Sequence, residues 1–148
     1  MFAKIIVATD FGEASERAVK MAAKLAETFH AALVVTHTYE TPVYAYPSAP
    51  VIPIMNITES VAKAAQMSLD AALPALRTQV PGALGVLRNG LPWRETLEVV
   101  KEQKGDLLIV GTHGRHGLSH ALLGSVAEKI VRMSHIPVLT VPAKAAKG

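Results

Sequence analysis

The sequence predicts an open α/β fold of three layers, in which five parallel strands form one sheet with helices on both faces. Short apolar runs that suit strands alternate with longer segments of helical periodicity, in the order β-α-β-α-β-α-β-α-β. The apolar runs are continuous, as in strands that are covered on both faces. Strict alternation implies parallel strands joined by right-handed crossovers, with a ligand site outside their carboxyl ends.

The composition fits a single globular domain. Of the 148 residues, 50% are hydrophobic and 18% are charged, so the chain can bury one substantial core. We expect this domain over residues 1–142 and a flexible tail over residues 143–148. Cysteine is absent, and neither a signal-peptide layout nor a membrane span is visible, which favours the cytoplasm. The net charge of +3 comes without the basic stripe and interleaved aromatics of a nucleic-acid binder.

The first three elements follow from the apolar pattern. Lys4–Ala8 is a buried strand that ends in Thr9-Asp10, and Ala32–His37 is a second strand. Between them, Glu13–Phe29 is a helix, with Gly12 at its cap and an acidic first turn that suits the helix dipole. Its expected core-facing residues are Ala14, Ala18, Met21, Ala22, Leu25 and Phe29.

A proline-rich segment, Tyr39–Ile57, precedes the second helix. Asn56 and Glu59 have the spacing of a capping box, which predicts that the helix begins there. Pro74 lies inside the helical pattern and should kink the helix or end it early. The proline-rich segment is either a lid or a stiff stretch whose apolar residues pack over the sheet or a dimer partner, and we favour the second interpretation. The expected core-facing residues of the helix are Val61, Ala65, Leu69, Ala72, Leu73 and Leu76.

The remaining elements alternate in the same way. Gly85 weakens the third predicted strand, Pro92 suits the first position of the next helix, and Gly105 suits its end. We expect strands over Ala83–Leu87, Asp106–Val110 and Ile136–Val141, and helices from Pro92 to Gly105 and over Ser125–Met133.

A glycine-rich segment follows the fourth predicted strand. It contains Gly111-Thr-His-Gly114, then nine residues, then Gly124-Ser125 at the start of the last helix. Glycine lets backbone N–H groups approach phosphate oxygens, and a helix N-terminus adds about half a positive charge. No Asp or Glu occurs from Leu107 to Ala127, whereas Arg115 and three histidines do. The pattern predicts a site for the phosphates of a nucleotide.

Several of these residues also have purely structural interpretations. Ser125 and Glu128 have the spacing of a capping box, and Asp10 stands where a carboxylate often caps a helix. Walker-type and dinucleotide glycine motifs are absent. Three histidines have a spacing that could bind zinc if they lay on a helix: His113, His116 and His120. Glycines interrupt them, and no carboxylate or cysteine completes the ligand set. We therefore expect no protein-bound metal.

Together these features resemble the universal stress protein family, in the subclass with an ATP-binding motif. That motif reads Gly, two residues, Gly, nine residues, and Gly followed by Ser or Thr. It is matched here by Gly111, Gly114 and Gly124-Ser125. The resemblance covers essentially the whole chain, and its other parts are Ile5–Asp10, Gly90-Leu-Pro92, Asp106–Gly111 and Pro137–Val141.

The resemblance implies a Rossmann-like sheet in the order 3-2-1-4-5 and a homodimer paired through the last strand, Val138–Val141. It implies an adenine nucleotide, ATP with Mg²⁺ held through the phosphates, across the ends of the first and fourth strands. Thr38, after the second strand, would contact adenine, and Arg115 could reach a phosphate. The residues that match the family's site are Ala8, Thr9, Asp10, Thr38, Val110, Gly111, Gly114, Arg115, Gly124, Ser125 and Val126.

The resemblance favours a dimeric stress-response regulator whose ATP occupancy alters its shape or its protein partners. Two alternatives stay open: a slow ATPase or nucleotidyl-transfer enzyme, and a protein-binding adaptor with a vestigial nucleotide site. Hydrolysis needs a placed general base and a metal-binding carboxylate, and Asp10 alone would have to serve. We therefore assign no catalytic residues and favour binding over turnover.

Overall fold

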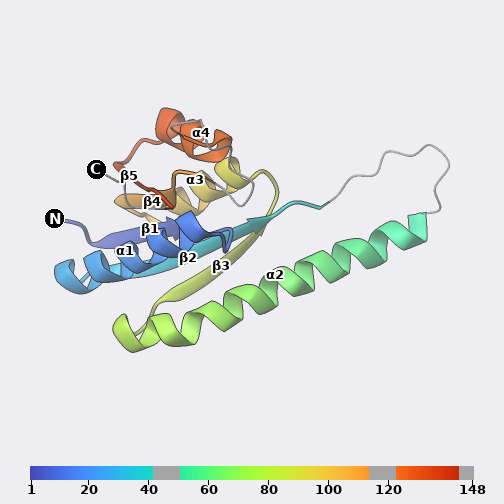
Figure 1. The fold of residues 1–148 in the computed structure, drawn as a ribbon, viewed down its shortest axis with the longest axis horizontal. Coiled ribbons are helices and arrows are strands. Elements are labelled where there is room, and N and C mark those ends of the chain that lie inside the picture. The colour runs from blue at the N-terminus through green and yellow to red at the C-terminus, as the bar shows by residue number, and fades with distance from the viewer. Residues whose placement is uncertain (42–50, 114–122, 144–148) are drawn as a thin grey trace.

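The structure is a computed structural model that describes residues 1–41, 51–113 and 123–143. Strands and helices alternate along these residues, as the sequence predicts (Figure 1). None of the helices described there is long and apolar enough to cross a membrane. The elements are β1 (Lys4–Ala8), α1 (Glu13–Phe29), β2 (Ala32–Tyr39), α2 (Val51–Gln79), β3 (Leu84–Asn89), α3 (Pro92–Gln103), β4 (Leu107–Gly111), α4 (Ser125–Met133) and β5 (Val138–Val141).

One parallel sheet carries these five strands, in the order β3-β2-β1-β4-β5. This order confirms the expectation for the sheet, including the pairing of the first and fourth strands. At the centre of the sheet, Val7 of β1 stands between Val35 of β2 and Ile109 of β4. The chain moves outward from β1 to β3 and then crosses back to β4. Strand order therefore reverses between β1 and β4, which is where open α/β sheets bind their ligands.

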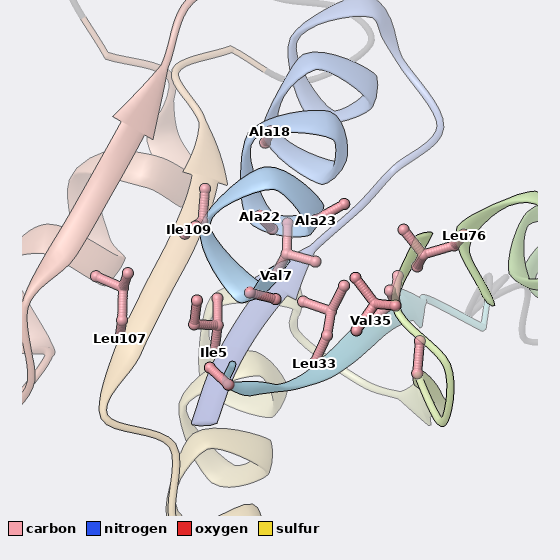
Figure 2. Close-up of a cluster of buried hydrophobic side chains, with 14 of the residues drawn as sticks. Ile5, Val7, Ala18, Ala22, Ala23, Leu33, Val35, Leu76, Leu107 and Ile109 are labelled. Carbon is pink, nitrogen blue, oxygen red and sulfur yellow. The ribbon is translucent and has the colours of Figure 1, made fainter. Parts of the chain in front are cut away.

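Helices cover both faces of the sheet. Ile5 and Val7 of β1 pack in the layer formed by α1 and α2, whereas Ile6 packs in the layer formed by α3 and α4. Figure 2 shows the first layer, with Ala18 and Ala22 of α1 among the side chains of the central strands. Small side chains on α1 allow the helix to lie close to the sheet. The two layers together fix the carboxyl ends of the strands.

Helix α1 has the predicted bounds. Gly12 is its N-cap, and His30 ends the helix in a left-handed conformation, with a φ of 55°. Four of the six residues expected in the core contribute to the α1–α2 layer or to its border, and Ala14 is also buried. Met21 does not, because it is 40% exposed. Since α1 follows β1 directly, its first turn lies at the carboxyl edge of the sheet and its last turn lies at the opposite edge.

Helix α2 begins earlier than predicted, at Val51 rather than at Asn56. The spacing of Asn56 and Glu59 therefore does not mark a helix start. Pro53 does not prevent the earlier start, because it falls in the first turn, where a backbone N–H has no helical partner to lose. Residues 42–50 of the proline-rich segment, and residues 144–148 of the predicted tail, lie outside the described residues.

Pro74 does not end α2, which continues to Gln79. Leu73 and Leu76 are buried on either side of the proline, with 6% and 8% exposure, and Pro74 itself faces solvent. Burying two leucines offsets the cost of an interior proline, which is about 3 kcal/mol. Ala72, which was expected in the core, is exposed.

Two glycines outside the glycine-rich segment that follows β4 are explained by close packing. A Cβ on Gly85 of β3 would lie 2.8 Å from Cδ1 of Leu73 on α2, so the small residue lets helix and strand approach. Gly105 does not provide the left-handed end of α3. Lys104 does, with a φ of 55°. A Cβ on Gly105 would instead overlap the side chain of Ile6.

Strand ends differ from the prediction by one or two residues. β2 continues to Tyr39, because its last residues pair with β3. β4 begins after Asp106, whose carboxylate accepts hydrogen bonds from the backbone N–H groups of Ala3 and Lys4, at 2.7 and 3.0 Å. β5 begins after Pro137, which has no N–H to donate to the sheet.

Candidate functional site

The turn after β1 is held by a compact set of hydrogen bonds. Asp10 Oδ1 accepts from the Gly12 N–H at 2.9 Å and from the Ser15 hydroxyl at 2.6 Å. The buried Thr9 hydroxyl accepts from the Phe11 N–H at 3.0 Å. Asp10 therefore braces the start of α1, in line with the structural interpretation of this carboxylate. The turn presents its backbone at the carboxyl edge of the sheet in a fixed shape.

Strand β2 also supports this turn. Phe11 has a left-handed backbone, with a φ of 63°, which is unusual for a bulky residue. Its ring packs on His37 with 4.6 Å between the ring centroids, and His37 Nδ1 lies 2.8 Å from the Thr9 carbonyl oxygen. His37 thus has a satisfied ring. These contacts tie β1 and β2 together at the edge and maintain the strained turn.

At the end of β4, Gly111 occupies a space that admits no side chain. A Cβ there would lie 2.9 Å from the backbone carbon of Ala14 and 2.9 Å from the Ser15 nitrogen. The first turn of α1 therefore passes directly against the end of β4. A glycine is needed at this position for packing, whatever the ligand.

The start of α4 is anchored beside the end of β4. Thr112 donates its N–H to the Val141 carbonyl of β5 at 2.9 Å, and its own carbonyl accepts from the Gly124 N–H at 2.6 Å. The second of these bonds joins the two ends of the segment between β4 and α4. Residues 114–122 of that segment lie outside the described residues, and with them the predicted site residues Gly114 and Arg115.

Helix α4 begins without a side-chain cap. Gly124 is its N-cap, in an extended conformation with φ −68° and ψ 166°. Ser125 and Val126 are exposed, and the Glu128 carboxylate pairs with Arg132 one turn further on. The capping-box interpretation of Ser125 is therefore wrong. The first backbone N–H groups of α4 are directed toward the carboxyl edge, where the helix dipole favours an anion.

The structure brings most of the predicted site residues to one edge. Ala8 and Val110 are neighbours in the α3–α4 layer at the ends of β1 and β4. Thr38 differs from the expectation, because it lies within β2 rather than after it. The site residues found in the described part of the chain are Ala8, Thr9, Asp10, Thr38, Val110, Gly111, Gly124, Ser125 and Val126.

Sequence reasoning missed one residue near this edge. Thr36 is 1% exposed, and its hydroxyl has no hydrogen-bond partner among the described residues. It pairs in register with Ala8. The sequence did offer a signal, because Thr36 is a polar residue directly after the aliphatic run Leu33–Val35. We interpreted this threonine only as a strand-forming residue.

The structure does not test the spacing of the three histidines after β4, because only His113 lies among the described residues. His113 lies 3.0 Å, through Nδ1, from the Thr112 hydroxyl, whereas His116 and His120 are outside the described residues. Over residues 1–41, 51–113 and 123–143, no three His, Asp or Glu side chains gather in a way that could hold a metal ion.

An open parallel sheet with a glycine turn and an uncapped helix start at its switch point defines a Rossmann-like α/β protein. The chain belongs to the universal stress protein family, whose family model matches residues 1–142. It is 32% identical over 147 residues to the universal stress protein YxiE of Bacillus subtilis, covering 95% of this chain and 99% of that protein.

Solved structures share the fold. The universal stress protein UspA from Lactobacillus plantarum has a TM-score of 0.82 at 19% identity, covering 94% of this chain and 97% of that one. A universal stress protein crystallised in complex with cAMP has a TM-score of 0.67 at 27% identity, covering 97% of this chain and 98% of that one.

Proposed function

We propose that this protein binds an adenine nucleotide, ATP with Mg²⁺ held through the phosphates, across the carboxyl ends of β1 and β4. The observation that carries the proposal is the uncapped start of α4, which the bond from the Gly124 N–H to the Thr112 carbonyl holds beside β4. A related universal stress protein, 27% identical to this chain, was crystallised with the adenine nucleotide cAMP.

The described residues fit the phosphates. Ser125 is exposed and makes no capping bond, and the carboxylate of the first turn, Glu128, pairs with Arg132. The Ser125 hydroxyl and backbone N–H can therefore both donate to phosphate oxygens. Gly124 adds no side chain that would keep a phosphate away. In the proposed complex, Gly111, Gly114 and Val126 line the ribose and phosphates, and Arg115 reaches a phosphate.

The base and ribose would lie on the opposite side of the switch point. Ala8, Thr9 and Asp10 border this region with the rigid turn after β1, and Val110 borders it from β4. Thr38 borders it from β2. Ala8 is half-buried, and its small side chain would obstruct a flat ring very little.

The same geometry favours binding over turnover. Asp10 lies at this edge, and its Oδ1 already accepts two hydrogen bonds that brace α1. A general base must be free to take a proton, so this role suits Asp10 poorly. We propose a dimeric cytoplasmic regulator whose nucleotide occupancy changes its shape or its protein partners.

A thermal-shift titration with ATP, AMP and GTP, with and without magnesium, tests the proposal. Ligand at about 100 times its Kd adds roughly 2.7 kcal/mol. For a chain of this size, that raises the unfolding midpoint by about 5–10 °C. We expect ATP to produce this shift and Gly124→Val to abolish it. A flat response to every nucleotide, together with no nucleotide released on denaturing the purified protein, would contradict the proposal.

Turnover is measured separately. We expect phosphate release from ATP at the rate of the buffer blank. Release well above the blank that Gly124→Val removes would favour a slow ATPase instead. Thr28→Val is the matched control, because Thr28 bonds the Lys24 carbonyl near the end of α1, at the opposite edge of the sheet.

A further inference from the structure

Trp93, the one tryptophan in the sequence, lies where α3 and α4 meet. The two helices pack against each other on the same face of the sheet (Figure 1). Trp93 belongs to the first turn of α3 and is half-buried at the border of the layer that these helices form. Because α3 and α4 both begin at the carboxyl edge of the sheet, the ring lies near the edge that carries the candidate site.

Two cations from different helices lie over this ring. Arg94 Cζ of α3 is 5.8 Å from the ring centroid, and Lys129 Nζ of α4 is 5.2 Å from it. The face of an aromatic ring attracts a cation, which offsets part of the repulsion between the two positive charges. These contacts also restrict two long side chains, so that less rotamer freedom is lost when an anion binds them.

Carboxylates on the same helices leave these cations unpaired. Glu102 and Glu128 each pair with another arginine. Glu98 follows Arg94 by four residues, a spacing that permits an ion pair, yet the structure shows none between them. Over the described residues, neither Arg94 nor Lys129 forms an ion pair. The surface around the ring therefore has an excess of positive charge.

We propose that Trp93, Arg94 and Lys129 form a docking surface, the Trp93 surface, for an acidic segment of a partner protein. Charge complementarity selects an anion. The ring contacts favour protein carboxylates over nucleic acid, because bases stack on an open aromatic face and cations lie over this one. Tryptophan and arginine are also the residues on which the binding energy of protein interfaces is concentrated.

Helix α4 couples this surface to the proposed nucleotide site. Lys129 follows Ser125 by four residues, so the two side chains lie on the same face of α4, about 5–6 Å apart along it. Phosphates at Ser125 would therefore repel an acidic segment at Lys129, and by linkage each ligand would weaken the binding of the other. This coupling rests on the proposed function and adds the chemistry of the protein partner that ATP displaces.

The fluorescence of Trp93 tests the inference, because no other tryptophan contributes to the signal. The probe is a poly-glutamate peptide, titrated into the purified protein. We expect a saturable change in emission and an affinity that falls as salt is added. Lys129→Gln and Arg94→Gln should each lower the affinity by about 2- to 5-fold, and saturating ATP should lower it by a similar factor.

Two variants serve as controls. Lys129→Arg keeps the charge and should bind the peptide as wild type does. Lys20→Gln is the matched neutralisation, because Lys20 is an exposed residue of α1, on the opposite face of the sheet. It should also bind the peptide as wild type does.

The outcomes separate the inference from the proposed function. The inference fails if the peptide produces no saturable change, or if Lys20→Gln costs as much affinity as Lys129→Gln, since net charge alone would then attract the peptide. It fails as well if a single-stranded oligonucleotide binds more tightly than the peptide, or if ATP that raises the unfolding midpoint leaves the peptide affinity unchanged. If the peptide binds as expected but no nucleotide raises the midpoint, the proposed function fails, whereas the docking of acidic segments stands.

Discussion

At the scale of single residues, Gly111 is a position where the fold leaves no space for a side chain. The atoms that a Cβ would meet at 2.9 Å include the backbone of Ala14 and Ser15. Backbone in a helix cannot move aside as a side chain can. We expect Gly111→Ala to lower the free energy of unfolding by about 1–3 kcal/mol. Urea denaturation of the nucleotide-free protein measures this difference.

Gly85→Ala is the matched control for this substitution. The atom nearest to its Cβ, at 2.8 Å, is Cδ1 of Leu73, the far end of a flexible side chain. Leu73 can turn to another rotamer, so the change should cost less than at Gly111. Equal costs at the two glycines would contradict the view that α1 packs against the end of β4 through rigid backbone.

Ser125 provides a second test at this scale. A serine that caps a helix contributes about 1 kcal/mol to stability. In the structure Gly124 is the N-cap and has no side-chain bond, so Ser125 does not cap α4. We expect Ser125→Ala to change the unfolding free energy of the nucleotide-free protein by less than about 0.5 kcal/mol. A loss near 1 kcal/mol in urea denaturation would restore the capping-box interpretation.

At the scale of elements, Pro74 on the exposed side of α2 destabilises that helix. Alanine there restores the backbone hydrogen bond and removes the clash of the proline ring. Part of the gain is lost, because proline also restricts the unfolded chain, by about 0.4–1 kcal/mol. We expect Pro74→Ala to raise the free energy of unfolding by about 2–2.5 kcal/mol, measured by urea denaturation.

The opposite result would also be informative. If Pro74→Ala destabilises the protein, a bend at the proline is needed to seat Leu73 and Leu76 on the sheet. Ala72→Ser is a suitable control, because Ala72 is an exposed neighbour on the same helix and its change should have little effect.

The elements that sequence reasoning located well are those whose local signals agree with their packing. α1 and α4 have the predicted bounds, because apolar periodicity and a glycine before the first turn point to the same start. The start of α2 was placed wrongly, because the spacing of Asn56 and Glu59 is a local signal that a longer helix overrides. The end of β2 depends on pairing with β3, which is distant in sequence.

The candidate site, like the fold, could be predicted from the sequence only in part. Glycine spacing identified the ends of the segment between β4 and α4, because phosphate sites require small residues at set positions. The bond between Gly124 and Thr112 could not be read from spacing, since it depends on how α4 returns to the sheet. Nor could the buried hydroxyl of Thr36, because threonine is an ordinary strand residue until its missing partner is seen.

At the scale of the whole molecule, exposed apolar residues gather around the outermost strand on one side of the described sheet. That strand is β5, and its Leu139 is 36% exposed. α4 packs next to β5 and presents Val126, Val131 and Met133, with exposures of 39%, 45% and 51%. An edge strand with apolar neighbours tends to pair with another chain unless charge protects it. The expected homodimer through Val138–Val141 would cover this surface.

We therefore expect Leu139→Lys to separate the dimer. A lysine on each copy would place two charges at the pairing strands, which is how natural edge strands avoid association. Sedimentation equilibrium should give twice the 15.7 kDa chain mass for wild type and the single chain mass for the variant. Met67→Lys, on an α2 residue that is 63% exposed, should remain dimeric. If Leu139→Lys stays dimeric while Met67→Lys dissociates, the interface lies along α2 and not along β5.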